Sequence, residues 1–258
     1  MQNVLNVLRN LPEGEYGLLV FSQLKQEMIQ SINPDLEIPL ASAAKLAIAF
    51  CVVKFIEEGR YTWNEKVSPM RFDPREDSQE LYPHFQQRSS LLLREAVEMM
   101  IACHDRFVAQ CVVNVVGGWE VVNATLQKYY PTIHVNDDPR DGQNKGQLSE
   151  VFELFQTIMR GYTETPELWV PIINGLVRQQ DKIEALPAHI INQMTGGLNH
   201  AVINIGVIGE FSKHPFLFAL GARNLPNRAT NTDADESIQE ALQLLYDAYA
   251  SQETLLIN

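Results

Sequence analysis

The chain has 258 residues, of which 45% are apolar and 20% are charged, and its formal net charge is −12 at pH 7. This length and composition suit a globular protein that can bury a sizeable core. The acidic balance argues against a nucleic-acid-binding or anionic-membrane-binding surface, because both need basic patches. We therefore expect a small-molecule substrate or ligand as the partner, with no nucleic acid and no membrane.

The first residues carry no secretory signature. Apolar positions over 4–11 recur at helical spacing rather than as a continuous run, and residues 12–14 (Pro-Glu-Gly) end that helix. No segment has the length of apolar run that spans a bilayer. Cys51, Cys103 and Cys111 lie in apolar, helix-like segments, which indicates buried free thiols. We expect a cytoplasmic protein, a processed or truncated chain being the alternative, and we favour a monomer.

The spacing of apolar residues changes period twice along the chain. Residues 15–32 have the period of two strands that form a hairpin. The spacing then becomes helical, and we expect helices at 41–58, 90–104, 105–116, 118–128, 146–160 and 166–180, with loops at 69–88 and 131–146. The strand period returns in three segments before a last helix, namely 190–195, 202–208, 216–221 and the helix 233–250.

This order of elements predicts the fold class. Two early strands and three late strands, with helices inserted between them, indicate one antiparallel sheet that is built from both ends of the chain. We predict an α/β (α+β) fold in a single domain, 1–258, with two lobes. The α/β lobe takes about 1–40 and 188–258, and an all-helical lobe takes about 41–187.

The most informative stretch is 38–53. It predicts a helix that starts just after Pro39, and Lys45 is its only charged residue. A helix that is apolar all round is normally buried, and a lone ammonium inside it is costly without a partner or a task. Ser42 lies one turn earlier on the same face, in a first turn whose free N–H groups favour developing negative charge. A nucleophile, a base and an oxyanion donor thus fall within four residues.

A purely structural interpretation of this pair stays open. Ser42 is then a helix N-cap, and Lys45 extends out of a core helix to reach water. Ser-x-x-Lys is a weak pattern by itself, since Ser22 and Lys25 match it too. That second pair follows a predicted strand, where positions three apart face opposite sides, so we interpret it as an accident of composition.

Three further segments make the pattern more specific. They are 96–118, which contains His104-Asp105-Arg106 and ends in Gly-Gly, then 176–188, and the tetrapeptide Met194-Thr195-Gly196-Gly197 on a predicted strand. Together with Ser42 and Lys45, these segments resemble the penicillin-recognising serine hydrolases, most nearly the class A β-lactamases, over nearly the whole chain. The resemblance implies a two-lobed fold with its cleft between sheet and helical lobe. It also strengthens Ser42 as the nucleophile and Lys45 as its base.

The second family motif is altered. His104-Asp105-Arg106 stands where the family has Ser-Asp-Asn. The family serine passes a proton to the leaving group, and an imidazole at His104 can do the same, although a histidine at a helix junction is commonly structural. The resemblance implies that Asp105 bonds backbone near the start of its helix. Arg106 replaces an asparagine; it brings a second cation near Lys45 that would lower the pKa of Lys45, or it indicates a site for a carboxylate or phosphate.

The third motif and the loop before it depart further. Met194 replaces the lysine that binds the β-lactam carboxylate in the family, whereas Thr195 keeps a hydroxyl and Gly197 keeps the position of an oxyanion N–H. The loop 130–146 stands where class A enzymes carry the glutamate that activates the deacylating water, and it contains no glutamate. Gln110 replaces an asparagine that helps to fix that loop. Efficient β-lactam hydrolysis by the class A route is therefore not expected.

Two functions from different classes follow. The first is a serine hydrolase or acyltransferase that forms an acyl-enzyme on Ser42, acts on an ester or amide, and returns a proton through His104. The second is a catalytically degenerate family member whose cleft binds a ligand or partner. A chain that acylates but never deacylates lies between them. Neither the histidines nor the cysteines show metal-ligand spacing, so we expect no metal and no cofactor.

Overall fold

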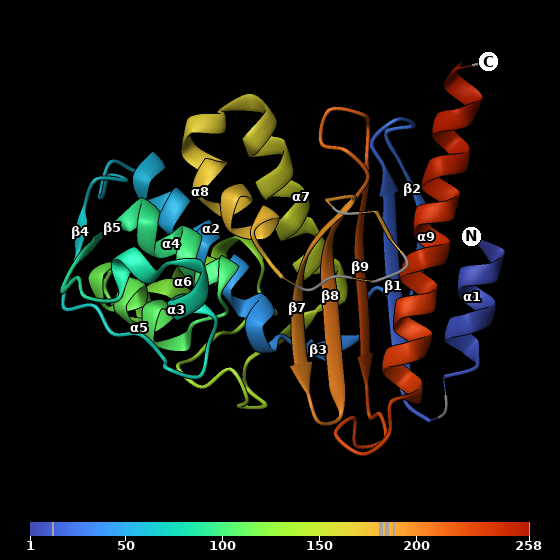
Figure 1. Cartoon of the computed structure of the whole chain (residues 1–258), viewed down its shortest axis with the longest axis horizontal. Coiled ribbons are helices and arrows are strands. Elements are labelled where there is room, and N and C mark those ends of the chain that lie inside the picture. Colours follow the sequence, from blue (N-terminus) through green and yellow to red (C-terminus); the bar gives the residue numbers. More distant parts are fainter. Residues whose placement is uncertain (12, 181–182, 184–185, 188, 258) are drawn as a thin grey trace.

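The computed structural model describes residues 1–11, 13–180, 183, 186–187 and 189–257. Its main sheet confirms the predicted α/β architecture, because five strands from both ends of the chain pair in the order β2-β1-β9-β8-β7, each antiparallel to its neighbour (Figure 1). The strands are β1 (Glu15–Ser22), β2 (Glu27–Ile32), β7 (Ile191–Leu198), β8 (Ala201–Ile208) and β9 (Phe216–Arg223).

Helices cover both faces of this sheet. On one face lie the two terminal helices, α1 (Gln2–Arg9) and α9 (Asp233–Ile257), which close an apolar cluster against the sheet (Figure 1). Because both faces are covered, every residue of β8 is buried, as expected for a central strand in such a sandwich. The other face receives the helical part of the chain, in which the predicted helical periods are confirmed as α2 (Ala44–Glu57), α4 (Leu93–Ala102), α5 (Arg106–Val115), α6 (Trp119–Tyr129), α7 (Leu148–Glu164) and α8 (Pro166–Val177).

The helix α2 is the centre of the helical part. Its residues Ala44–Val53 are all buried, so the absence of a polar face in the sequence follows from contact on every side. It packs against α4, α5, α6, α7 and α8. The three cysteines are free and buried, as predicted. Among the described residues, no single helix is long and apolar enough to cross a membrane, and only α5 and α6 taken together, bent by 85° at their break, match such a span.

Several short elements were not predicted. β3 (Glu37–Pro39) pairs with β6 (Lys145–Gln147), and β4 (Lys66–Val67) pairs with β5 (Leu91–Leu92). The stretch expected as a loop over 69–88 holds the one-turn helices α3 (Ser78–Leu81) and η2 (Pro83–Phe85). Two or three paired residues carry no detectable period, so periodicity misses them.

The start of the central helix also differs from the prediction. Residues Ala41–Ala43 form a 3-10 turn, η1, and the α-helix begins only at Ala44. Ala41 adopts a left-handed backbone with φ of 45°, which is strained for a residue other than glycine. Ser42 therefore lies on a tight, strained turn that leads into α2, rather than in the first turn of the α-helix.

One glycine brings the two chain ends together at this turn. A Cβ atom at Gly196 of β7 would lie 2.2 Å from the carbonyl oxygen of Leu40 and 3.2 Å from the amide nitrogen of Ala43. Only a residue without a side chain allows β7 to approach η1 so closely. Close packing alone therefore explains why residue 196 is a glycine.

Gly196→Ala is expected to destabilise the fold by about 2–3 kcal/mol, because the new methyl group meets backbone atoms that cannot move aside. Urea unfolding measures this loss. Gly197→Ala is the matched control, since its Cβ would meet only the end of the Arg228 side chain, at 3.0 Å. Equal stability of the two variants would contradict the close approach of β7 and η1.

Candidate active site

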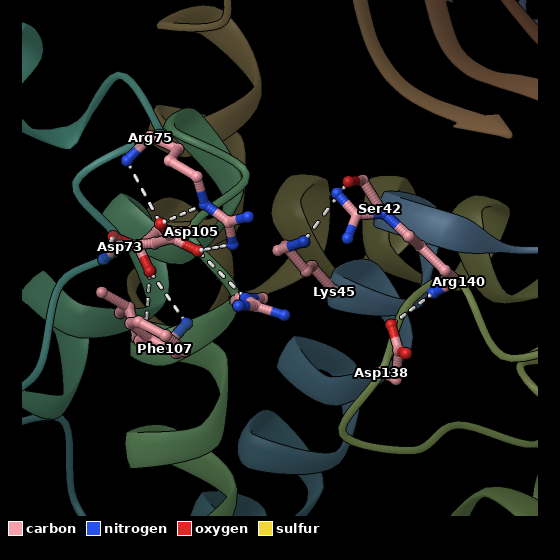
Figure 2. A network of polar contacts seen from close by, with 10 residues as sticks. Ser42, Lys45, Asp73, Arg75, Asp105, Phe107, Asp138 and Arg140 are labelled. Carbon is pink, nitrogen blue, oxygen red and sulfur yellow. Dashed lines mark hydrogen bonds and ion pairs between the residues drawn. The ribbon is translucent and has the colours of Figure 1, made fainter.

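Ser42 and Lys45 meet as predicted from their spacing. The ammonium of Lys45 donates a 3.3 Å hydrogen bond to Oγ of Ser42, from the first turn of α2 to η1 (Figure 2). Ser42 is half-buried, and Lys45 is only 3% exposed, so this lysine does not extend out to water. No side chain caps η1 or α2. The purely structural interpretation predicted a helix cap by Ser42 and a solvent-exposed Lys45 ammonium. Neither is present, because Ser42 caps no helix and Lys45 is buried.

The second Ser-x-x-Lys pair is placed quite differently. Ser22 ends β1, and its hydroxyl bonds the side chain of Gln252 at 3.1 Å and accepts the backbone N–H of Lys25. The Lys25 side chain is exposed and pairs with Glu27. A hydroxyl held in this way, without an ammonium beside it, has no base to activate it.

Burial sets the charge state of Lys45. Removal from water lowers the pKa of Lys45 from 10.5 to about 8, and the negative charges of Glu76 and then Asp105 act against this lowering. Glu76 is half-buried in the 69–88 loop, where burial raises the pKa of its own carboxyl group and Lys45 opposes that rise. Near this pH, Lys45 is thus present in both its protonated form and its neutral, proton-accepting form.

Asp105 has the structural role that the resemblance implied. It caps α5, and its carboxylate accepts the backbone N–H groups of Phe107 at 2.9 Å and Val108 at 3.1 Å. It also accepts the N–H of Asp73 at 3.0 Å, which ties the 69–88 loop to the start of α5 (Figure 2). Burial raises the pKa of Asp105, and these backbone N–H groups counteract the rise.

Arg106 is held by a carboxylate that sequence reasoning missed. Its Nε donates to Asp73 at 3.0 Å, and Arg75 binds the same carboxylate through two nitrogens, at 3.0 and 2.8 Å. The Arg75 guanidinium, the largest influence, holds the pKa of Asp73 well below its usual range. Arg106 does line a small cavity together with Lys45. The lowered pKa of Lys45, however, comes from burial, and the Arg106 charge is compensated by Asp73.

His104 and Met194 are joined through a third residue. Gln179, just after α8, donates its amide group to the carbonyl of Ile101 and to the sulfur of Met194, and its Oε1 lies 3.0 Å from Nε2 of His104. Because the amide is fixed by those acceptors, Nε2 of His104 carries the proton of that bond. His104 has a left-handed backbone, with φ of 55°, and Met194 is fully buried.

Thr195 and Gly197 face the opposite side of β7 from Met194 and Gly196, as strand alternation requires. The Thr195 hydroxyl donates to Asn204 of β8 at 3.0 Å and lines a cavity beneath α9. Gly197 lines a separate, larger cleft of about 730 Å³. The structure therefore brings Ser42 and Lys45 together and places Arg106 on the cavity that Lys45 lines. It joins His104 to Met194 through Gln179, whereas the Thr195 side chain lies on the α9 face.

The 130–146 loop borders the site next to the start of α2. Asn144 is buried, and its Nδ2 donates to the carbonyl of strained Ala41 at 3.2 Å. Asn136, Asp137 and Asn144 line the small cavity of about 20 Å³ that also holds Lys45. The Oδ1 atoms of Asn136 and Asn144 are buried acceptors with no partner among the described protein atoms. They offer two acceptors to one water molecule, for which a cavity of this size has room.

Sequence reasoning missed the residues that surround the predicted ones. The 69–88 and 130–146 segments, expected as loops, supply Asp73, Glu76, Asn136 and Asn144, and their only sequence signal is a concentration of polar residues next to helix starts. Among the described residues, no group of three or more His, Cys, Asp or Glu side chains is placed to hold a metal.

The comparisons with known proteins agree with this fold. PBP-A, solved as a mutant in an acyl-enzyme complex with penicillin-G, superposes with a TM-score of 0.80 at 19% identity and covers 97% of this chain and 96% of that one. An ancestral class A β-lactamase gives 0.77 at 17% identity, with 96% and 98% covered. At these identities the likeness shows the fold alone. No curated protein matches the sequence.

A family match covers nearly the whole sequence. The sequence model described as the Beta-lactamase enzyme family matches residues 1–249. This span includes the Ser42–Lys45 pair, the altered His104-Asp105-Arg106 segment and the strand of Met194–Gly197. The chain therefore belongs to the β-lactamase enzyme family of serine hydrolases.

Proposed function

We propose that this chain is a serine hydrolase that forms an acyl-enzyme on Ser42 and acts on an ester or amide, with little or no class A β-lactam turnover. The observation that carries the proposal is the 3.3 Å contact between Ser42 Oγ and the buried Lys45. A serine hydroxyl becomes a nucleophile when an adjacent base takes its proton. Burial prepares Lys45 for that role because it lowers the pKa of this lysine to about 8.

The acylation step uses groups from both chain ends. Neutral Lys45 takes the proton of Ser42 as Oγ bonds the substrate carbonyl carbon, and the carbonyl oxygen becomes an oxyanion. The backbone N–H groups of Ser42 and Gly197 are the proposed donors to that oxyanion. The bond to the leaving group then breaks, and the proton that Lys45 took from Ser42 is passed to His104, which gives a proton to the departing atom. Arg106 belongs to the proposed substrate-binding wall, whereas Met194 is fully buried and the Thr195 hydroxyl is bonded to Asn204 on the α9 face.

The cavity beside Lys45 is poorly equipped for deacylation. The small cavity beside Lys45 offers the amide oxygens of Asn136 and Asn144, which orient a water molecule but cannot accept its proton. Asp137 also lines the cavity but is exposed, so water screens its charge. We expect the acyl-enzyme to persist much longer than the acylation step that forms it.

Intact mass after incubation with a fluorophosphonate, and separately with benzylpenicillin, tests the nucleophile. The native chain and Ser22→Ala, which removes the hydroxyl of the second Ser-x-x-Lys pair, are expected to gain one fluorophosphonate adduct, and Ser42→Ala none. An adduct on Ser42→Ala, or no adduct on the native chain, would contradict the proposal; the second result favours a ligand-binding family member. A penicillin adduct that forms and is then lost would show turnover instead of trapping.

The labelling rate is expected to rise with pH and to level off above a midpoint near 8, because only neutral Lys45 accepts the Ser42 proton. Glu76→Gln should move this midpoint to lower pH, since it removes the negative charge that raises the pKa of Lys45 most. Mass spectrometry of labelling reactions quenched at timed intervals, across the pH range, measures the rate profile and its midpoint in each variant. Glu80→Gln, an exposed neighbour in α3, is the control and should leave the midpoint unchanged. A rate independent of pH would remove Lys45 from the role of base.

His104→Asn tests the proton return without breaking the turn, because asparagine tolerates the left-handed backbone. The rate at which an alkyl ester acylates Ser42 is expected to fall by about 10²-fold or more, since its leaving group needs a proton. The acylation rate with the 4-nitrophenyl ester of the same acid, followed as the burst of nitrophenolate, should change little, because nitrophenolate departs without a proton. His214→Asn, also left-handed at φ of 40°, is the matched control. An equal loss on both esters would indicate a purely structural His104.

A further inference from the structure

The end of helix α8 is packed tightly against α4, and this contact places Gln179. A Cβ atom at Gly175 of α8 would lie 2.7 Å from Cβ of Ile101 and 2.8 Å from the carbonyl oxygen of Glu98, so only a glycine allows the two helices to come this close. The Arg178 guanidinium pairs with the Glu98 carboxylate and fixes the same end of α8. Gln179 follows directly, and it is half-buried beside the last turn of α4.

The neighbours of the Gln179 side chain decide which way its amide group points. Its Nε2 lies 3.0 Å from the carbonyl oxygen of Ile101 and 3.4 Å from Sδ of Met194. Both of these atoms accept hydrogen bonds and neither can donate one, so the NH₂ end of the amide faces them. The oxygen end therefore faces His104, where Oε1 lies 3.0 Å from Nε2 of the imidazole ring.

This bond to an amide oxygen also determines which nitrogen of His104 carries the proton. A neutral imidazole has one N–H group and one bare, basic nitrogen. Because Oε1 of Gln179 can only accept, Nε2 of His104 holds the N–H group, and Nδ1 is the basic nitrogen of the neutral ring. The proton that the ring takes up and gives away is then the one on Nδ1.

Gln179 orients the ring without adding charge. A carboxylate at the same place would also accept the Nε2 proton, but it would stabilise the imidazolium and so hold the second proton back from a leaving group. An ammonium would donate to Nε2 instead and reverse the ring. An uncharged acceptor that is tied at its other end to Ile101 and Met194 avoids both effects.

We propose that Gln179 is a positioning residue for the proton transfer that accompanies acylation of Ser42, and that it acts through His104. Nδ1 of His104 receives the proton that Lys45 took from Ser42 and gives it to the departing atom as the bond to the acyl carbon breaks. Nε2 keeps its own proton on Oε1 of Gln179 throughout, so the ring ends the step neutral and in the tautomer in which it began. This inference rests on the proposed function, because it assigns one nitrogen to one step of that reaction.

The tautomer of His104 is measured by long-range ¹H–¹⁵N correlation NMR of the full chain with ¹⁵N-labelled histidine, at a pH of about 8, where an ordinary histidine is neutral. The chain has six histidines, and the His104 signals are those absent from His104→Asn. We expect the proton on Nε2 in the native chain and in Gln179→Glu, which keeps an acceptor. Gln179→Lys should move it to Nδ1, because an ammonium can still donate to the same two acceptors but offers Nε2 a donor.

Gln180→Lys is the matched control, because it makes the same change of charge at the exposed neighbouring residue. This variant should keep the native tautomer. A native His104 with its proton on Nδ1 would overturn the proposal, and that result needs no variant at position 179. A proton that stays on Nε2 in Gln179→Lys would overturn it as well.

Acylation rates test the same proposal through Gln179→Met, which fills similar space without an acceptor for the N–H group of His104. Acylation by methyl hexanoate, followed by intact mass, is expected to slow by about tenfold or more, because the ring is no longer held for proton transfer. Acylation by 4-nitrophenyl hexanoate, followed as the burst of nitrophenolate, should change little. An equal loss on both esters, or no loss on either, would show that Gln179 does not position the proton.

Fluorophosphonate labelling separates failure of this inference from failure of the proposed function. Fluoride departs from that probe without a proton from His104, so the label reports only on the nucleophile. A native chain that is not labelled contradicts the proposed function. Normal labelling together with a native tautomer in Gln179→Lys contradicts the role of Gln179 alone.

Discussion

The burial of one ammonium group beside one hydroxyl is the constraint on which the rest of the site depends. The lowering of the Lys45 pKa from 10.5 to about 8 corresponds to about 3 kcal/mol against the charged form. This penalty reduces the stability of the fold below a pH of about 8 and vanishes as the pH rises past 10.5. The apolar packing of α2 on every side offsets this penalty, so a core helix can carry a buried lysine.

The same neighbourhood contains the strained backbone of Ala41 and the close approach of Gly196. Asn144 fixes the carbonyl of Ala41 from the loop side, and β7 fixes the turn from the sheet side. Each support comes from a different part of the chain. Local strain of this kind persists only when the surroundings over-determine it, and it is commonly found at functional sites.

Much of the fold and part of the site could be predicted from the sequence, for identifiable reasons. Helices and long strands have periods, and Ser42 of η1 and Lys45 of α2 are three positions apart in one helical run, so their contact followed from spacing alone. The ion pair of Arg106 could not be predicted in this way, because its partner Asp73 lies 33 positions away and meets it only through the fold. Asn144 escaped prediction because a loop residue has no periodic signal, and its contact with the carbonyl of Ala41, 103 positions away, is made only by the fold.

The meeting of η1 with β7 has a consequence for synthesis. Ser42 and Lys45 leave the ribosome long before Gly196 and Gly197, and α2 cannot bury its lysine until the later helices have been made. During translation the nascent chain therefore presents a solvated ammonium with its ordinary proton affinity and a hydroxyl without its β7 neighbour. The burial of Lys45 and the contact of η1 with β7 therefore arise only when the last strands have joined the sheet.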